Sequence, residues 1–184
     1  LLTSNTIDTF THAQFTIQFY YKQLPFYVIL LYPTFIYAAV LAARRLKVGP
    51  VATFFTAGLL AVMIDIPFDI MGPDCGWWWW HEGGEDPYGL VGHRRLGVPV
   101  SSYCWHLLFN GSQGSVTSRF SEGLQARLGG RGLLATLAGL TPATMILGAL
   151  GLLMGVVVMM PFHAFRAVGF TDGVFTATLL VVAS

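Results

Sequence analysis

The chain has 184 residues, of which 54% are hydrophobic and only 10% are charged, whereas about 25% of the residues in a soluble domain are charged. Its formal net charge is +1, so nothing in the charge balance indicates a nucleic-acid-binding protein. A soluble fold would need a larger core than a chain of this length can enclose. The composition therefore predicts a helical membrane protein with several spans.

The N-terminal half contains two charge-free runs long enough to cross a bilayer. Residues 1–22 mix polar and aromatic side chains, and we expect an interfacial helix or the end of a span there. A first full span is predicted over about 24–43 and a second over about 51–71, because roughly 20 helical residues cross the hydrocarbon core. The second span is expected to close at Gly72-Pro73, and a long polar loop follows over 72–97.

The C-terminal half is predicted to add two more spans and part of another. Four segments are expected: a third helix from Val98 over at least 101–109, a weak point at 110–114, an amphipathic segment over 115–131, and a fourth span within 133–160. A fifth span starts near Gly173. The predicted fold is all-α, a polytopic transmembrane bundle of about four full spans plus a partial fifth. We expect one membrane domain, residues 1–184, that is part of a longer chain.

The charges of the connecting segments predict an orientation. Segments 44–50 and 111–131 are basic, whereas the 72–97 loop carries four acidic residues and two arginines. Basic loops stay on the cytoplasmic side of a membrane. We therefore expect 44–50 and 111–131 on the cytoplasmic side, or on the stromal or matrix side in an organelle, and the 72–97 loop on the other. The sequence leaves the organelle open.

Two aspartates interrupt the second apolar run. Asp65 and Asp69 are four residues apart and share one helix face. A carboxylate in hydrocarbon is costly unless it is paired, protonated or facing water, so such a residue indicates function by default. Two carboxylates this close are expected to share a proton, which suits acid–base catalysis. Alternatively, the pair is structural, lies near the membrane surface and binds Arg94 or Arg95.

A second polar stripe is expected on the third helix. Ser102, His106 and Asn110 are four residues apart and lie on one face, next to Trp105. His106 could transfer protons, ligate a pigment metal or hydrogen-bond a neighbour. If the second and third spans pack antiparallel, this stripe meets the two aspartates.

The loop after the second span opens with four consecutive tryptophans. Tryptophan favours the headgroup level of a membrane, so Trp77, Trp78, Trp79 and Trp80 form an interfacial anchor, or some of them line a ligand pocket. His81 and the nearby acids could bind a divalent metal, but a solvated acidic loop is the favoured interpretation. Cys75 and Cys104 form no metal or redox motif, and we predict two unpaired thiols. No metal site and no cofactor are expected.

Several motifs resemble an integral-membrane family. They are LPFYVILLYP over 24–33, DIPFD over 65–69, GWWW over 76–79, and GVPVS over 97–101 with Trp105. In order and spacing they are similar to the carotenoid-biosynthesis family that includes bisanhydrobacterioruberin hydratase. They also resemble a eukaryotic membrane family with a WW.WH…DP loop and a GVP.TSY.WH helix. The resemblance implies an enzyme that hydrates a double bond of a long isoprenoid held in the bilayer.

The functional prediction has two alternatives. In the first, the protein binds or acts on an isoprenoid or other lipid, or a pigment, through Asp65, Asp69 and His106 as catalytic residues. Its ligand-binding residues would be Trp77, Trp78, Trp79, Ser102, Trp105 and Asn110. In the second, it is a non-catalytic subunit of a respiratory or photosynthetic membrane complex. Gly148, Gly151 and Gly155 form a small-residue face, which favours contact with a partner helix.

Overall fold

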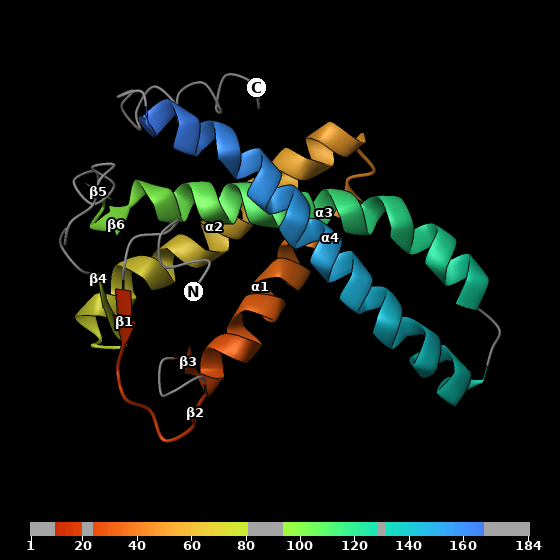
Figure 1. The fold of residues 1–184 in the computed structure, drawn as a ribbon, viewed down its shortest axis with the longest axis horizontal. Coiled ribbons are helices and arrows are strands. Elements are labelled where there is room, and N and C mark those ends of the chain that lie inside the picture. The colour runs from red at the N-terminus through yellow and green to blue at the C-terminus, as the bar shows by residue number, and fades with distance from the viewer. Residues whose placement is uncertain (1–9, 20–23, 81–93, 129–131, 168–184) are drawn as a thin grey trace.

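The computed structural model describes residues 10–19, 24–80, 94–128 and 132–167 (Figure 1). Four helices make up most of this part of the chain: α1 (Phe26–Arg45), α2 (Pro50–Asp74), α3 (Val100–Leu128) and α4 (Leu133–Ala167). Three of the described segments are long and apolar enough to cross a membrane: Phe26–Arg45, Pro50–Asp74 and Thr141–Pro161. The predicted membrane protein is thus supported by three candidate spans. The prediction of four spans and a partial fifth is wrong for the described residues, and the region after Gly173 lies outside them.

The first two predicted spans are confirmed as α1 and α2. Pro50 occupies the first turn of α2, where the missing N–H of proline costs nothing. The turn between the helices passes through Lys47, whose φ of 52° is left-handed. The predicted end of α2 at Gly72-Pro73 is wrong by a few residues, because the helix continues to Asp74 and the chain turns at Gly76, with φ of 68°.

Helix α3 is uninterrupted from Val100 to Leu128, so the helix does not weaken or end at 110–114 as predicted. Residues 115–128 of the predicted amphipathic segment belong to this same helix, and 129–131 lie outside the described residues. Glycine weakens a helix in isolation by about 1 kcal/mol, but here Gly111 and Gly114 lie against α2. A Cβ at Gly111 would stand 2.6 Å from the Phe54 carbonyl oxygen, and one at Gly114 would meet the Ala57 side chain. The glycines let two helices approach closely, and this packing keeps the helix continuous. Helix α3 is the central element and contacts α1, α2 and α4.

The N-terminal segment does not form the predicted interfacial helix in its described part. Strand β1 (Phe10–His12) pairs antiparallel with β4 (Trp78–Trp80), and β2 (Gln18–Phe19) pairs with β3 (Leu24–Pro25). A third short pair joins β5 (Arg94–Arg95) to β6 (Val98–Pro99) just before α3. Alternating polar and aromatic residues suit the two-residue period of a strand, which explains why this segment forms strands and not the predicted helix.

Helix α4 packs on the face of α3 opposite the aspartates' helix. Gly151 lies against Gln113 and Gly155 against Phe109, so these two glycines contact α3 of the same chain. A Cβ at Gly148 would meet nothing within 4 Å, and a partner helix at this position stays a prediction. Large apolar side chains elsewhere on α4 are exposed: Met145, Ile146, Leu150, Leu152, Leu153, Val156, Val157 and Met160.

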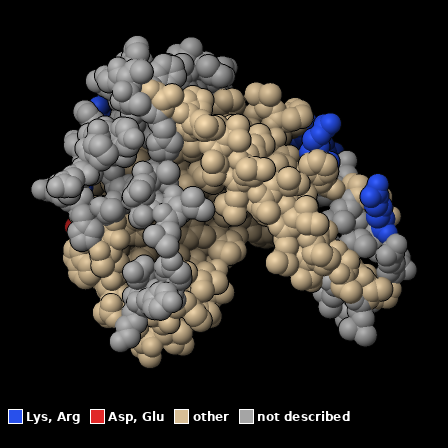
Figure 2. Space-filling view, viewed as in Figure 1, with Lys and Arg blue, Asp and Glu red and all other residues tan. Residues whose placement is uncertain are grey.

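The described surface is divided by charge. In Figure 2 most of the blue Lys and Arg atoms lie at the right-hand end, near the α1–α2 turn and the far half of α3, while the broad middle of this face is uncharged. An uncharged belt of this kind is what a helical bundle presents to lipid. The side of the membrane on which each end lies remains a prediction.

Candidate functional site

The two predicted polar stripes face each other. Asp65 Oδ2 lies 2.7 Å from His106 Nε2, and the Ser102 hydroxyl donates a hydrogen bond of 2.6 Å to Asp69 Oδ2. All four residues are buried, with Asp65 and His106 each only 4% exposed. The antiparallel contact of α2 and α3 therefore brings the acidic face against the histidine face, as expected. The alternative pairing with Arg94 or Arg95 is absent from the described ion pairs.

Close helix packing holds these groups in register. Gly58 of α2 lies against the Leu107 backbone, and Gly111 of α3 lies against the Phe54 backbone. Any side chain at these two positions would push the helices apart. Since hydrogen bonds weaken steeply beyond about 3.2 Å, even a small separation would break the Asp65–His106 contact. The sequence thus positions the site through glycines on both helices, with Gly58 about two turns before Asp65 and Gly111 a little more than one turn after His106.

His106 is held on two further sides. The Asn110 amide nitrogen donates to the His106 carbonyl oxygen at 2.9 Å and lies 3.5 Å from His106 Nδ1. Tyr32 of α1 stacks on the imidazole, with ring centroids 5.9 Å apart and planes inclined by 5°. Side chains of three helices therefore surround one ring, and its Nε2 lies 2.7 Å from Asp65 Oδ2.

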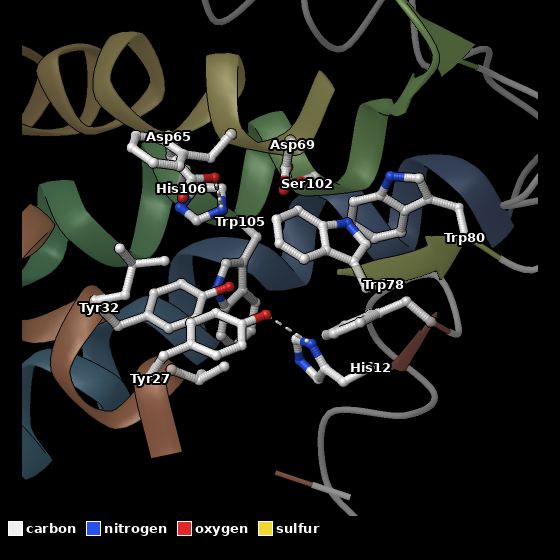
Figure 3. Close-up of a pocket in the computed structure, with 14 residues that line it drawn as sticks. His12, Tyr27, Tyr32, Asp65, Asp69, Trp78, Trp80, Ser102, Trp105 and His106 are labelled. Atoms are coloured by element: carbon white, nitrogen blue, oxygen red, sulfur yellow. Dashed lines mark hydrogen bonds and ion pairs between the residues drawn. The ribbon is translucent and has the colours of Figure 1, made fainter. Parts of the chain in front are cut away.

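A cavity lies beside these groups (Figure 3). Its volume is about 50 Å³, which is room for a few water molecules. Aromatic and aliphatic side chains dominate the lining, and the polar cluster occupies one wall. The lining residues are Phe10, His12, Tyr27, Val28, Leu31, Tyr32, Asp65, Phe68, Asp69, Trp78, Trp80, Ser102, Trp105 and His106.

The β1–β4 ribbon forms another wall of the cavity. Phe10 pairs with Trp80 and His12 with Trp78 across the ribbon. The Tyr27 hydroxyl and His12 Nδ1 are hydrogen-bonded at 3.1 Å, as Figure 3 shows. His12 lies outside the candidate spans, and burial lowers its pKa below the usual 6.5. The imidazole of His12 is therefore neutral at physiological pH.

Two hydrogen-bond donors in the lining have no partner. The indole nitrogens of Trp78 and Trp80 are buried and unbonded among the described residues. A buried donor without a partner costs about 1–3 kcal/mol, and most such groups in native proteins find one. These two N–H groups are therefore available to an acceptor oxygen of a bound molecule.

The structure separates the predicted binding residues into two sets. Trp78, Ser102 and Trp105 line the cavity, whereas Trp77 and Trp79 are 38% and 49% exposed and do not. Asn110 supports His106 from outside the cavity. Cys75 and Cys104 form no disulfide among the described residues, as expected.

The sequence interpretation missed several lining residues, chiefly His12, Tyr27 and Tyr32. Val28, Leu31 and Tyr32 recur at helical spacing, and a tyrosine in an apolar span is a signal that could have been used. No such signal existed for His12, because its place depends on a strand pairing across two intervening helices.

The same side chains form a candidate cation site. The ligating atoms of Asp65, Asp69 and His106 all lie within 4.8 Å of one another. One imidazole and two carboxylates are a donor set that Zn²⁺ or Mn²⁺ accepts. The 2.7 Å between Asp65 Oδ2 and His106 Nε2 is an ion-pair distance, but Asp65 Oδ2 has no hydrogen-bond partner among the described residues. Either a shared proton or a cation would compensate this buried oxygen.

A family model covers most of the site. The model of a domain of unknown function, DUF7802, matches residues 1–124, about two thirds of the chain. The chain belongs to the DUF7802 family. The DUF7802 match includes α1, α2, all cavity-lining residues and most of α3, and it ends before α4. No curated protein and no solved structure matches the chain. The comparisons therefore give no support to the resemblance with the carotenoid-biosynthesis family.

Proposed function

We propose that this DUF7802 protein binds the end of a long, lipid-soluble molecule in the aromatic cavity and transfers a proton to it. The observation that carries the proposal is the placement of the buried Asp65–His106 pair on the cavity wall. Ionisable residues kept within a candidate span usually serve a transport path or a reaction. Charged groups on several spans would favour a transport path, but those of α1 are confined to its last turn, at Arg44 and Arg45, and Thr141–Pro161 of α4 contains none.

The cavity suits the end of a chain rather than a whole lipid. Its volume of about 50 Å³ is far below the roughly 300–1,000 Å³ of a pocket for a drug-sized ligand. Aromatic rings on its walls complement an unsaturated hydrocarbon. The free indole N–H groups of Trp78 and Trp80 suit one oxygen atom. We therefore propose a linear isoprenoid whose terminus enters the cavity while its chain stays in the bilayer.

The proposed reaction adds water to a terminal double bond. A protonated Asp65 or Asp69 donates its proton to the less substituted carbon, which leaves a carbocation on the neighbouring tertiary carbon. The rings of Trp78 and Trp105 stabilise this cation through their π faces. A water oriented by His106 then bonds to the cation, and the proton that this water loses returns to the carboxylate. One water is consumed, and the acid is regenerated.

The test uses the purified protein in lipid nanodiscs with a linear carotenoid hydrocarbon as the probe. In water labelled with ¹⁸O, the wild-type protein should incorporate one labelled oxygen per hydrated terminus. Asp65→Asn and Asp69→Asn each remove one candidate proton donor, and the variant that loses the actual donor should turn over more slowly by a factor of about 10²–10⁴. Turnover that is unchanged in both variants would overturn the chemistry.

Binding has its own test with a matched pair of variants. Trp78→Phe loses an unpartnered indole N–H of the cavity, whereas Trp79→Phe changes a neighbouring exposed ring. We expect weaker binding of the hydrated carotenoid product only for Trp78→Phe, measured by quenching of the remaining tryptophan fluorescence. Equal effects of the two variants would contradict binding in the cavity. Loss of binding on treatment with a metal chelator would favour the cation site over a shared proton.

A non-catalytic subunit is the second proposal, and the exposed apolar side chains of α4 favour it. They offer a long surface to another membrane subunit or to lipid. Under this proposal, the protein would co-purify with a partner, and Asp65→Asn would weaken the fold without affecting any turnover.

A further inference from the structure

A second hollow lies away from the aspartate site, at the end of the bundle where α1 ends and α2 begins. Its volume is about 870 Å³, and it is open to solvent. Four cationic side chains line it, together with three hydroxyl-bearing and three apolar ones. The residues are Leu41, Arg44, Arg45, Lys47, Val48, Pro50, Thr53, Ser115, Ser118 and Arg119. We propose that this basic groove binds the phosphate headgroup of an anionic phospholipid.

The charge of the basic groove is not neutralised within the described protein. No carboxylate lines the groove, and none of its four cations forms an ion pair with a described residue. The cations come from both sides of the groove, with Arg44, Arg45 and Lys47 around the α1–α2 turn and Arg119 on α3. Cations that converge from separate elements suit a single anion held between them.

The backbone conformation at Lys47 indicates that this lysine does more than place a positive charge on one side of the membrane. Lys47 has a φ of 52°, in the left-handed region that side chains with a Cβ avoid and glycine adopts freely. Helices commonly end with glycine at this position. A lysine here costs stability, although the chain has a glycine only two residues later, at Gly49. If the fold needed only a positive charge near the membrane surface, a lysine at an unstrained position would supply it, so the strained position of Lys47 indicates a more specific role.

The hydroxyl groups of the basic groove provide another observation. Thr53 Oγ1 donates to the carbonyl oxygens of Val48 and Gly49, so its proton is committed to the turn. Ser118 Oγ is buried and has no hydrogen-bond partner among the described residues. A phosphate has strong acceptor oxygens. Ser118 is next to Arg119 in the sequence and about one helical turn after Ser115.

The location identifies a lipid as the source of the phosphate. The basic groove lies where one candidate span, Phe26–Arg45, ends and the next, Pro50–Asp74, begins. This is the level of the lipid headgroups. Leu41, Val48 and Pro50 give it an apolar edge, along which acyl chains can continue into the bilayer. Arg and Lys near the end of a span attract anionic lipid by about 1 kcal/mol per residue, or roughly fivefold in affinity.

The test is native mass spectrometry of the detergent-solubilised chain titrated with defined lipids. We expect phosphatidylglycerol to remain bound where phosphatidylcholine dissociates. Lys47→Gly and Arg119→Gln should each weaken phosphatidylglycerol binding roughly fivefold, and the double variant by more than tenfold. Arg127→Gln is the matched control, because Arg127 is an exposed cation of α3 outside the basic groove.

Lys47→Gly also separates binding from folding. Glycine relieves the left-handed strain, so this variant should melt at the same temperature as the wild type or higher while it binds less lipid. Three results would overturn the proposal: equal binding of both lipids, an equal loss in Arg127→Gln, or competition by inorganic phosphate at the concentration at which phosphatidylglycerol binds. The last result would identify a soluble phosphate compound as the ligand.

Discussion

At the scale of single residues, the buried Asp65–His106 pair dominates the energetics of the site. Removing one partner of a buried polar pair leaves the other group without a partner, which typically costs about 1–3 kcal/mol if that group is neutral and about 3–5 kcal/mol if it is charged. The pair is 2.7 Å apart and nearly inaccessible, and Tyr32 and Asn110 restrict the imidazole further. A group this constrained is already oriented before a ligand arrives, which lowers the cost of reaching a reactive geometry.

His12 gives the cavity wall a pH dependence. Its pKa in the folded chain is below 6.5 because of burial, whereas the unfolded chain takes up the proton near 6.5. The unfolded state therefore binds more protons once the pH falls below about 6.5, and this lowers the stability of the fold. At pH values well above 6.5 His12 is neutral in both the folded and the unfolded chain, so this loss of stability is absent.

We expect the melting temperature of the protein in detergent to fall between pH 7.5 and pH 5.5. The fall should be smaller in His12→Gln, which keeps a polar group beside Tyr27 but does not titrate. Thermal unfolding followed by circular dichroism at the two pH values measures the difference. Identical pH dependence in both proteins would show that His12 does not carry the effect.

The polar groups of the site could be predicted at this scale, and the aromatic wall could not. Asp65, Asp69, Ser102 and His106 stand out because each is polar in an apolar helix and because their four-residue spacing fixes a common face. Trp77 to Trp80 are equivalent in sequence, and only the pairing of β4 with β1 buries Trp78 and exposes Trp79. Contacts between segments this far apart leave no local pattern.

At the scale of helices, close α2–α3 packing depends on positions without side chains. A glycine within a helix is usually interpreted as a weak point, and Gly111 and Gly114 led to the wrong prediction of a helix break. The structure shows the opposite effect, because each glycine lies against α2. Small residues at helix contacts permit close approach of the two backbones. The free energy gained from this packing then exceeds the low helix propensity of glycine.

Alanine substitution tests this at two glycines with different surroundings. At Gly111 the added Cβ would stand 2.6 Å from the Phe54 carbonyl oxygen, so the helices must separate, at a cost of about 1–3 kcal/mol. At Gly148 the Cβ meets nothing within 4 Å, and Gly→Ala within a helix stabilises it by up to about 1 kcal/mol. We expect Gly111→Ala to lower the melting temperature and Gly148→Ala to leave it unchanged or raise it. A comparable loss in both variants would contradict the close contact.

At the scale of the whole molecule, α4 is the least enclosed helix. It contacts chiefly α3, and Met145 and Leu153 are 71% and 62% exposed. The sequence predicted this span from its apolar run, because length and hydropathy are summed over many residues and tolerate local error. The prediction of a helix in the N-terminal segment was wrong, because in so short a segment a few residues decide between helix and strand.

Spin labels on α4 test its exposure to lipid. With Cys75 and Cys104 replaced by serine and alanine, a nitroxide at Met145→Cys or Leu153→Cys should be relaxed by oxygen, which concentrates in the bilayer, and not by a water-soluble nickel chelate. A label at Met159→Cys is the control, because Met159 is 3% exposed and packs on α3. Protection of all three sites from oxygen would indicate a partner subunit on this face.

The pairing of β1 with β4 determines when the cavity can exist during synthesis. Phe10 and Trp80 are joined across α1 and α2, so the ribbon cannot close until both helices have left the ribosome and packed as a hairpin. The polar wall needs α3 as well, since His106 and Ser102 are added later still. Until then Asp65 and Asp69 have neither partner, and the nascent second span carries two uncompensated carboxyl groups. Assembly of the cavity is thus coupled to the arrival of α3 in the membrane, and a ribosome paused before residue 100 would hold a hairpin with its acidic face unprotected.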